Sequence, residues 1–218
     1  MSQKTWNAVD DYLNHLIVRP DAALAAALDA SREAGLPEIA VSAPQGKQLH
    51  LLAKAMRARR ILEIGTLGGY SAIWLARALP SDGQLITLEY SSKHADVARA
   101  NLARAGLAAV TDVRVGAGLE LLPTLTGPFD FFFIDANKDD YPGYFRGCLE
   151  LSRPGSMMVF DNVVREGEII DARTRDPNVR AVRQLYEELA AEARVSATSI
   201  QTVGVKGYDG FCIAVVNR

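Results

Sequence analysis

The sequence predicts an α/β protein with a doubly wound, mostly parallel sheet of seven strands and an antiparallel hairpin at its C-terminal edge. From Arg59 onward, short apolar runs alternate with longer amphipathic stretches, and this alternation indicates parallel strands joined by helices. The runs FDFFFID and SMMVFD are almost continuously apolar, which is typical of strands buried on both faces. Only the turn sequence KGYDG at residues 206–210 separates the last two apolar runs, so these strands should be antiparallel.

The first 57 residues are predicted to be helical. Apolar residues from Trp6 to Ile17 recur at helical spacing. Pro20-Asp21 begins a second, alanine-rich helix that Gly35-Leu36-Pro37 ends, and Ser42-Ala43-Pro44 begins a third. These helices should form an extension to the sheet domain.

The rest of the chain divides into alternating strands and helices. Strands are expected at residues 61–64, 84–88, 110–115, 129–134, 156–160, 195–203 and 211–216. Helices are expected at residues 70–79, 91–105, 119–125, 141–151 and 179–193. We therefore expect a single domain over residues 1–218, with an N-terminal helical extension (1–57) and an α/β core (58–218).

The composition excludes several classes of protein. The chain has 218 residues, is 49% hydrophobic and 23% charged, and has a formal net charge of -2. It shows no basic patch, so no nucleic-acid partner is expected. No apolar run approaches the roughly 18 residues of a membrane span, and the polar N-terminus does not resemble a secretory signal. Cys148 and Cys212 are isolated and predicted to be buried thiols, and we expect a cytoplasmic protein without membrane association.

The first strand leads into a glycine-rich loop, ILEIGTLGGYS. Ligands of such sheets bind outside the carboxyl ends of the strands, and the glycines let the backbone approach a ligand closely. A dinucleotide fingerprint would require glycine where Leu67 and Tyr70 stand, so a pyrophosphate fits poorly. Glu63 instead suits a cationic ligand, and Glu89, at the end of the second strand, suits two ribose hydroxyls. The alternative is that both carboxylates are merely solvated strand ends.

Three oxygen-bearing side chains follow the fourth and fifth strands, namely Asp135, Asp161 and Asn162. Neighbouring strands lie about 4.8 Å apart, so these side chains can share one ion, and ligation by oxygen alone favours Mg²⁺ or Ca²⁺. A cation there disfavours the ammonium form of Lys138, three residues after Asp135, as a general base requires. Alternatively, Asp161 and Asn162 only cap a loop and Lys138 is a solvated lysine.

Together, LEIGTLGGYSA, IDANK and FDN make the chain similar, from about Ser42 to the C-terminus, to the cation-dependent O-methyltransferases, which include catechol and caffeoyl-coenzyme A O-methyltransferases. The resemblance implies a Rossmann-like class I methyltransferase fold and S-adenosylmethionine as the cofactor. It implies a cofactor site formed by Val41, Glu63, Gly65, Tyr70, Ser71, Glu89, Gly116, Ala117 and Asp135. It implies metal binding by Asp135, Asp161 and Asn162, and catalysis by Lys138 and Asp135. Gly118 departs from the catechol-type members, which have a serine near the adenine.

The expected activity is methyl transfer to a hydroxyl of a small aromatic, catechol-like acceptor, assisted by a divalent cation. Two alternatives are a nicotinamide-dependent oxidoreductase, which the glycine spacing disfavours, and a non-catalytic S-adenosylmethionine-binding protein, which would not need Lys138 or a metal. The family is usually dimeric, so a homodimer is expected, with the N-terminal helices as its interface.

Overall fold

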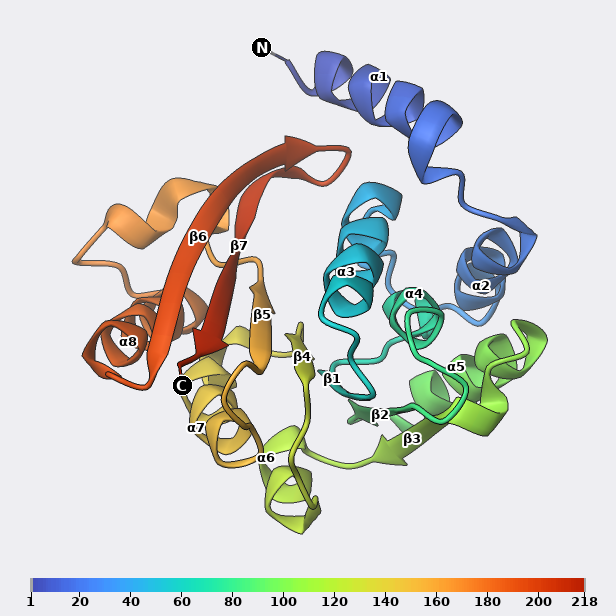
Figure 1. Ribbon diagram of the computed structural model, residues 1–218. Helices are drawn as coiled ribbons and strands as arrows, with labels where there is room; N and C mark the ends of the chain where they lie inside the picture. The colour runs from blue at the N-terminus through green and yellow to red at the C-terminus, as the bar shows by residue number, and fades with distance from the viewer. Residues whose placement is uncertain (1, 218) are drawn as a thin grey trace.

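A computed structural model describes residues 2–217 and shows a seven-stranded sheet with helices on both faces (Figure 1). The strand order is β3-β2-β1-β4-β5-β7-β6. Neighbouring strands from β3 through β5 pair in parallel, whereas β7 pairs antiparallel with both β5 and β6. After β1 the chain builds outward to β3 and then returns to add β4 on the other side of β1. The predicted doubly wound sheet with its antiparallel edge is confirmed, and its switch point lies between β1 and β4.

The strands are β1 (Arg60–Ile64), β2 (Gln84–Glu89), β3 (Thr111–Val115), β4 (Phe131–Ile134), β5 (Met157–Asp161), β6 (Val195–Gly204) and β7 (Gly207–Val216). The α-helices are α1 (Gln3–Leu13), α2 (Ala22–Glu33), α3 (Ala43–Ala55), α4 (Tyr70–Ala76), α5 (Ser92–Arg104), α6 (Gly118–Leu121), α7 (Tyr141–Glu150) and α8 (Pro177–Ala191). Shorter turns are the π-helix η1 (Asn14–Val18) and the 3₁₀ helices η2 (Ala108–Val110), η3 (Leu122–Thr124), η4 (Lys138–Asp140) and η5 (Arg165–Ile170).

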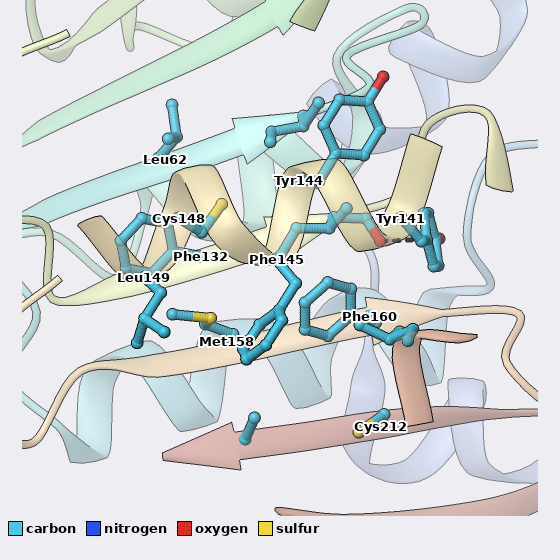
Figure 2. Packing of buried hydrophobic residues seen from close by; sticks show 14 of the residues in the cluster. Leu62, Phe132, Tyr141, Tyr144, Phe145, Cys148, Leu149, Met158, Phe160 and Cys212 are labelled. Atoms are coloured by element: carbon cyan, nitrogen blue, oxygen red, sulfur yellow. Dashed lines mark hydrogen bonds between the residues drawn. The ribbon is translucent and has the colours of Figure 1, made fainter. Parts of the chain in front are cut away.

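Strand β4, at the centre of the sheet, is apolar throughout because helices cover both of its faces. In β4, Phe132 and Ile134 belong to one buried cluster, and Phe131 and Phe133 belong to another. Alternate residues of a strand point to opposite faces, so both sets are buried. Figure 2 shows the first cluster, in which side chains of α7 pack on Phe132 of β4 and on residues of β5. The second cluster contains residues of α3, α4 and α5.

The N-terminal helices differ in how closely they join the sheet domain. Helices α2 and α3 contribute Leu24, Ala27 and Leu49 to the second buried cluster. Helix α1 buries none of its residues and contacts the β6–β7 hairpin, where Asp10 accepts a hydrogen bond from the N–H of Val205 (2.7 Å). No helix within residues 2–217 has the length and apolar character needed to cross a membrane.

Two predicted boundaries were wrong for identifiable reasons. The sequence KGYDG was expected to be the hairpin turn, but Gly204 pairs with Gly207 and residues 207–210 belong to β7. The side chain of Asp209, which the prediction assigned to the turn, instead accepts hydrogen bonds from the N–H groups of Val164 and Arg165 (both 2.9 Å). It therefore makes a tertiary contact and does not form the turn. The helix expected at residues 119–125 is divided into α6 and η3, and proline stands in the first turn of η3.

Candidate active site

A cavity of about 720 Å³ opens at the carboxyl ends of the parallel strands. This volume is in the range of small-molecule and cofactor sites. Most of the predicted site residues line it: Val41, Gly65, Tyr70, Ser71, Glu89, Gly116, Ala117, Asp135, Lys138 and Asn162. Glu63 and Asp161 are buried and do not line the cavity, although the residue that follows each of them in the sequence does. The structure thus brings the predicted residues to one edge of the sheet.

The glycine loop after β1 is shaped by close contact with the neighbouring strand. Gly65 has a φ of +101°, and a Cβ there would collide with the backbone carbonyl of Asp135. The N–H groups of Thr66 and Leu67 donate to Oε2 of Glu89, at 3.2 and 2.7 Å. A single buried carboxylate therefore holds the loop against the end of β2, where loop and carboxylate together form one wall of the cavity.

Glu63 lies behind this wall. Its Oε2 accepts a hydrogen bond of 2.5 Å from the hydroxyl of Thr87, while its Oε1 is buried without a hydrogen-bond partner. The pKa of Glu63 is raised to about 7, mainly by burial. The hydroxyls of Ser71 and Thr87 lower this pKa, whereas the charges of Asp135 and Glu89 raise it. Because it does not reach the cavity surface, Glu63 would act on a cationic ligand through its charge and not by contact.

Replacing Glu63 by glutamine should change how stability depends on pH. The pKa of Glu63 lies above its usual value of 4.5, so the folded state favours the protonated form. The stability that this provides is fully present below about pH 4.5 and is lost as the pH rises through about 7. This pH-dependent part of the free energy of unfolding amounts to about 3 kcal/mol for a pKa that rises from 4.5 to about 7. The glutamine variant lacks it because glutamine does not titrate. Urea unfolding of both proteins at pH 5 and pH 8 measures it, and equal pH dependence in the two would contradict the prediction.

Asp135 and Asp161 stand at the ends of adjacent strands. Ile134 of β4 pairs with Phe160 of β5, so the next residue of each strand is a carboxylate at the same edge. The buried hydroxyl of Tyr141 lies 3.0 Å from the carbonyl oxygen of Ile134 and 2.8 Å from that of Asp161. Tyr141 therefore ties the two strand ends together, and Figure 2 shows its place at one end of the core cluster.

The electrostatics of this pair favour a cation. Burial, and after it the neighbouring charge of Asp135, raises the pKa of Asp161 to about 7. Asn162, whose φ is +51°, donates its N–H to Oδ1 of Asp161 (2.9 Å) and lines the cavity. Within residues 2–217, no three His, Cys, Asp or Glu side chains gather into a possible metal site; the predicted set has two carboxylates and one amide. These oxygen donors fit a hard divalent ion.

Lys138 extends along the same edge of the cavity. Its Nζ donates to Oδ1 of Asp135 (2.7 Å) and to the carbonyl oxygen of Ala136 (2.9 Å). It also lies 5.2 Å from the centre of the Tyr141 ring. With only 12% of its side chain exposed, Lys138 is not the freely solvated lysine of the alternative interpretation. Its amine is held at the cavity wall beside the paired carboxylates.

Sequence reasoning missed two features of the cavity wall. The departure at Gly118 has a steric reason, because a Cβ there would lie 2.9 Å from the ring of Tyr144. The hydroxyl of Tyr144 donates to Oδ1 of Asn137 (2.8 Å), and both residues line the cavity. His94 also lines it, with Nδ1 3.3 Å from Oε1 of Glu89. Only the position of His94, five residues after Glu89 and in the first turn of α5, offered a signal in the sequence.

Comparison with known proteins identifies the family of the chain. A sequence model of a family described as O-methyltransferase matches residues 21–214. A catechol O-methyltransferase from Niastella koreensis is 48% identical, covering 99% of this chain and 100% of its own. One from Mycobacterium tuberculosis is 52% identical, covering 95% and 94%.

Solved structures give the same result. The O-methyltransferase TomG from Streptomyces achromogenes, in complex with S-adenosylmethionine, is 55% identical with a TM-score of 0.97, and all of both chains is covered. An O-methyltransferase from Bacillus cereus in complex with S-adenosylhomocysteine is 52% identical with a TM-score of 0.97, covering 99% of this chain and 100% of its own. These relatives are described as O-methyltransferases, which disfavours the two alternatives raised from the sequence, an oxidoreductase and a non-catalytic binding protein. The chain belongs to the O-methyltransferase family and is an S-adenosylmethionine-dependent O-methyltransferase.

Proposed function

We propose that the chain transfers the methyl group of S-adenosylmethionine to a hydroxyl of a small, catechol-like aromatic acceptor, with the help of Mg²⁺ or Ca²⁺. The observation that carries this proposal is the pair of carboxylates, Asp135 and Asp161, at adjacent strand ends beside the cavity. Their mutual repulsion favours a shared cation. Two relatives about half identical in sequence bear the name catechol O-methyltransferase, which supports this class of acceptor.

The cofactor would occupy the part of the cavity formed by the glycine loop and the end of β2. Gly65 lets the backbone approach, and Glu89 would accept hydrogen bonds from the ribose hydroxyls. Gly116 and Ala117 would lie beside the adenine, and Val41, Tyr70 and Ser71 would lie near the methionine end. The negative charges of Glu63, which is buried, and of Asp135, at the cavity wall, would favour the positively charged ammonium and sulfonium groups.

Asp135, Asp161 and Asn162 would hold the cation, which when bound would polarise an acceptor hydroxyl as a Lewis acid. The chain's own residues would do the rest. Lys138, fixed at the cavity wall by Asp135 and the carbonyl of Ala136, would take the hydroxyl proton at Nζ in its neutral form. The cavity would hold the acceptor oxygen in line with the methyl carbon and the departing sulfur, and this orientation would supply much of the rate enhancement.

A transfer assay tests the proposal. The purified chain is incubated with methyl-labelled S-adenosylmethionine and catechol, with phenol as the single-hydroxyl control. We expect label in catechol with Mg²⁺ present, loss of transfer after EDTA treatment, and recovery when Mg²⁺ is returned. Unchanged transfer after rigorous metal removal would contradict the role of the cation. Transfer to phenol as fast as to catechol would contradict the choice of acceptor.

We further propose that the chain works as a homodimer in the cytoplasm. The exposed apolar side chains near α1 and the β6–β7 hairpin support the dimer, since neighbouring copies can bury them. These side chains are Val9, Tyr12, Leu16 and Ile17 in the N-terminal helices and Ile200, Val203 and Val205 in the hairpin. Light scattering of the purified chain would determine its mass in solution.

A further inference from the structure

His94 stands in the first turn of α5, at the cavity wall, and the proposed chemistry gives it no role. Its Nδ1 lies 3.3 Å from Oε1 of Glu89, and 26% of its side chain is exposed. The backbone N–H of His94 faces the Ser91 hydroxyl (3.4 Å), which begins the helix. The start of α5 therefore places the imidazole directly beside the carboxylate that would bind the ribose.

Three backbone N–H groups use most of the hydrogen-bonding capacity of Glu89. Its Oε2 accepts the N–H groups of Thr66 (3.2 Å) and Leu67 (2.7 Å), and its Oε1 accepts the N–H of Ser91 (2.9 Å) and faces His94. A carboxylate offers about four acceptor positions, two on each oxygen. Backbone groups fixed by the loops on either side fill three of these positions, and the imidazole faces the fourth at 3.3 Å. Only the imidazole can leave by rotating its side chain.

A ribose hydroxyl has complementary requirements. When it donates to Glu89, it needs one acceptor position on that carboxylate, and its own oxygen then has lone pairs free to accept a hydrogen bond. Because a carboxylate accepts but does not donate, its proximity to Nδ1 of His94 selects the imidazole tautomer with the proton on Nδ1. The displaced imidazole thus carries a donor at the place where the hydroxyl needs one.

We propose that His94 is a second ribose-binding residue. It yields its position on Oε1 of Glu89 to one ribose hydroxyl and donates the Nδ1 proton to that same hydroxyl oxygen. The hydroxyl then lies between an acceptor and a donor, and His94 recognises one of the two hydroxyls of the ribose. This inference rests on the proposed placement of the ribose at Glu89.

The experiment measures binding of S-adenosylhomocysteine and its 2′-deoxy and 3′-deoxy analogues by calorimetry. The proteins are wild type, His94→Phe, His94→Asn, and the control Asp96→Asn, whose side chain is exposed on the same helix and bonds to Arg99. Phenylalanine keeps an aromatic ring without a donor, whereas asparagine has an N–H donor at a similar reach. The melting temperature of each ligand-free variant checks that it folds.

Wild type and Asp96→Asn should bind one deoxy analogue more weakly than the full ligand by threefold or more. His94→Phe should lose about three- to tenfold in affinity for the full ligand, as expected for one hydrogen bond. Its preference for the full ligand over that analogue should shrink by the same factor, and Glu89 should account for what remains. His94→Asn should regain most of the discrimination.

Two other outcomes would overturn the inference in distinguishable ways. If His94→Phe weakens all three ligands equally, or none of them, His94 does not bind the hydroxyl although the ribose placement stands. If wild type binds both deoxy analogues as tightly as the full ligand, the ribose does not lie at Glu89, and the proposed cofactor placement fails together with the inference.

Discussion

Replacing Asp161 by alanine is expected to lower methyl transfer by about a hundred- to a thousandfold, while cofactor affinity stays within about threefold of wild type. Asp161 does not line the cavity and has no predicted contact with the cofactor. Its loss should weaken cation binding, and Lewis-acid assistance is worth several kcal/mol, with a tenfold rate change for each 1.36 kcal/mol. The measurements are kcat at a Mg²⁺ concentration that just saturates the wild type and the affinity for S-adenosylhomocysteine by calorimetry.

The control is Asp139→Ala, which removes an exposed carboxylate from the same loop as Asp135; we expect it to keep wild-type activity. Misfolding should not explain a loss in Asp161→Ala, because burial raises the pKa of Asp161 to about 7. At pH 8 the alanine variant no longer has to bury a charged carboxylate. In the absence of metal, its free energy of unfolding should therefore fall by no more than the contribution of the hydrogen bond from the N–H of Asn162. Equal losses of activity and of cofactor affinity would show that Asp161 serves the cofactor pocket instead.

The position of the site at one edge of the sheet could be predicted, because the apolar pattern of the strands and their parallel direction determine which residues lie at that edge. Apolar strands that alternate with helices are typical of a parallel sheet covered on both faces, and the carboxyl ends of parallel strands lie at one edge. Any polar residue that directly follows such a strand must therefore lie at that edge. Asp135 and Asp161 satisfy this condition, and the pairing of Ile134 with Phe160 places them side by side.

Contacts between distant segments could not be predicted in the same way. Tyr144 fills the space beside Gly118, and Asp209 binds the backbone at Val164; each contact depends on how helices and loops pack after the sheet forms. The burial of Glu63 could not be predicted either, because the strand pattern gives its position along β1 but not that it would be fully buried beside the hydroxyls of Ser71 and Thr87. Propensity and spacing describe local geometry, and these features depend on tertiary packing.

Lys138 provides the second large effect. Replacing it by methionine should lower kcat by about a hundred- to a ten-thousandfold, the range for losing a general base, with cofactor affinity little changed. The structure, however, also shows Lys138 bonded to Asp135 (2.7 Å), so a loss of activity could reflect disturbance of that carboxylate. Lys138→Arg separates the two roles. Arginine keeps a positive charge near Asp135 but does not give up its proton in proteins.

If Lys138 takes the acceptor proton, Lys138→Arg should be nearly as inactive as Lys138→Met; if it only holds Asp135, the arginine variant should keep much of the activity. A second measurement varies the acceptor. The loss in Lys138→Met should shrink along a series from catechol to 4-nitrocatechol, because a more acidic hydroxyl depends less on a base to remove its proton. A loss that is the same for every acceptor, together with an active arginine variant, would assign Lys138 to positioning Asp135 and would leave the proton to be taken by solvent.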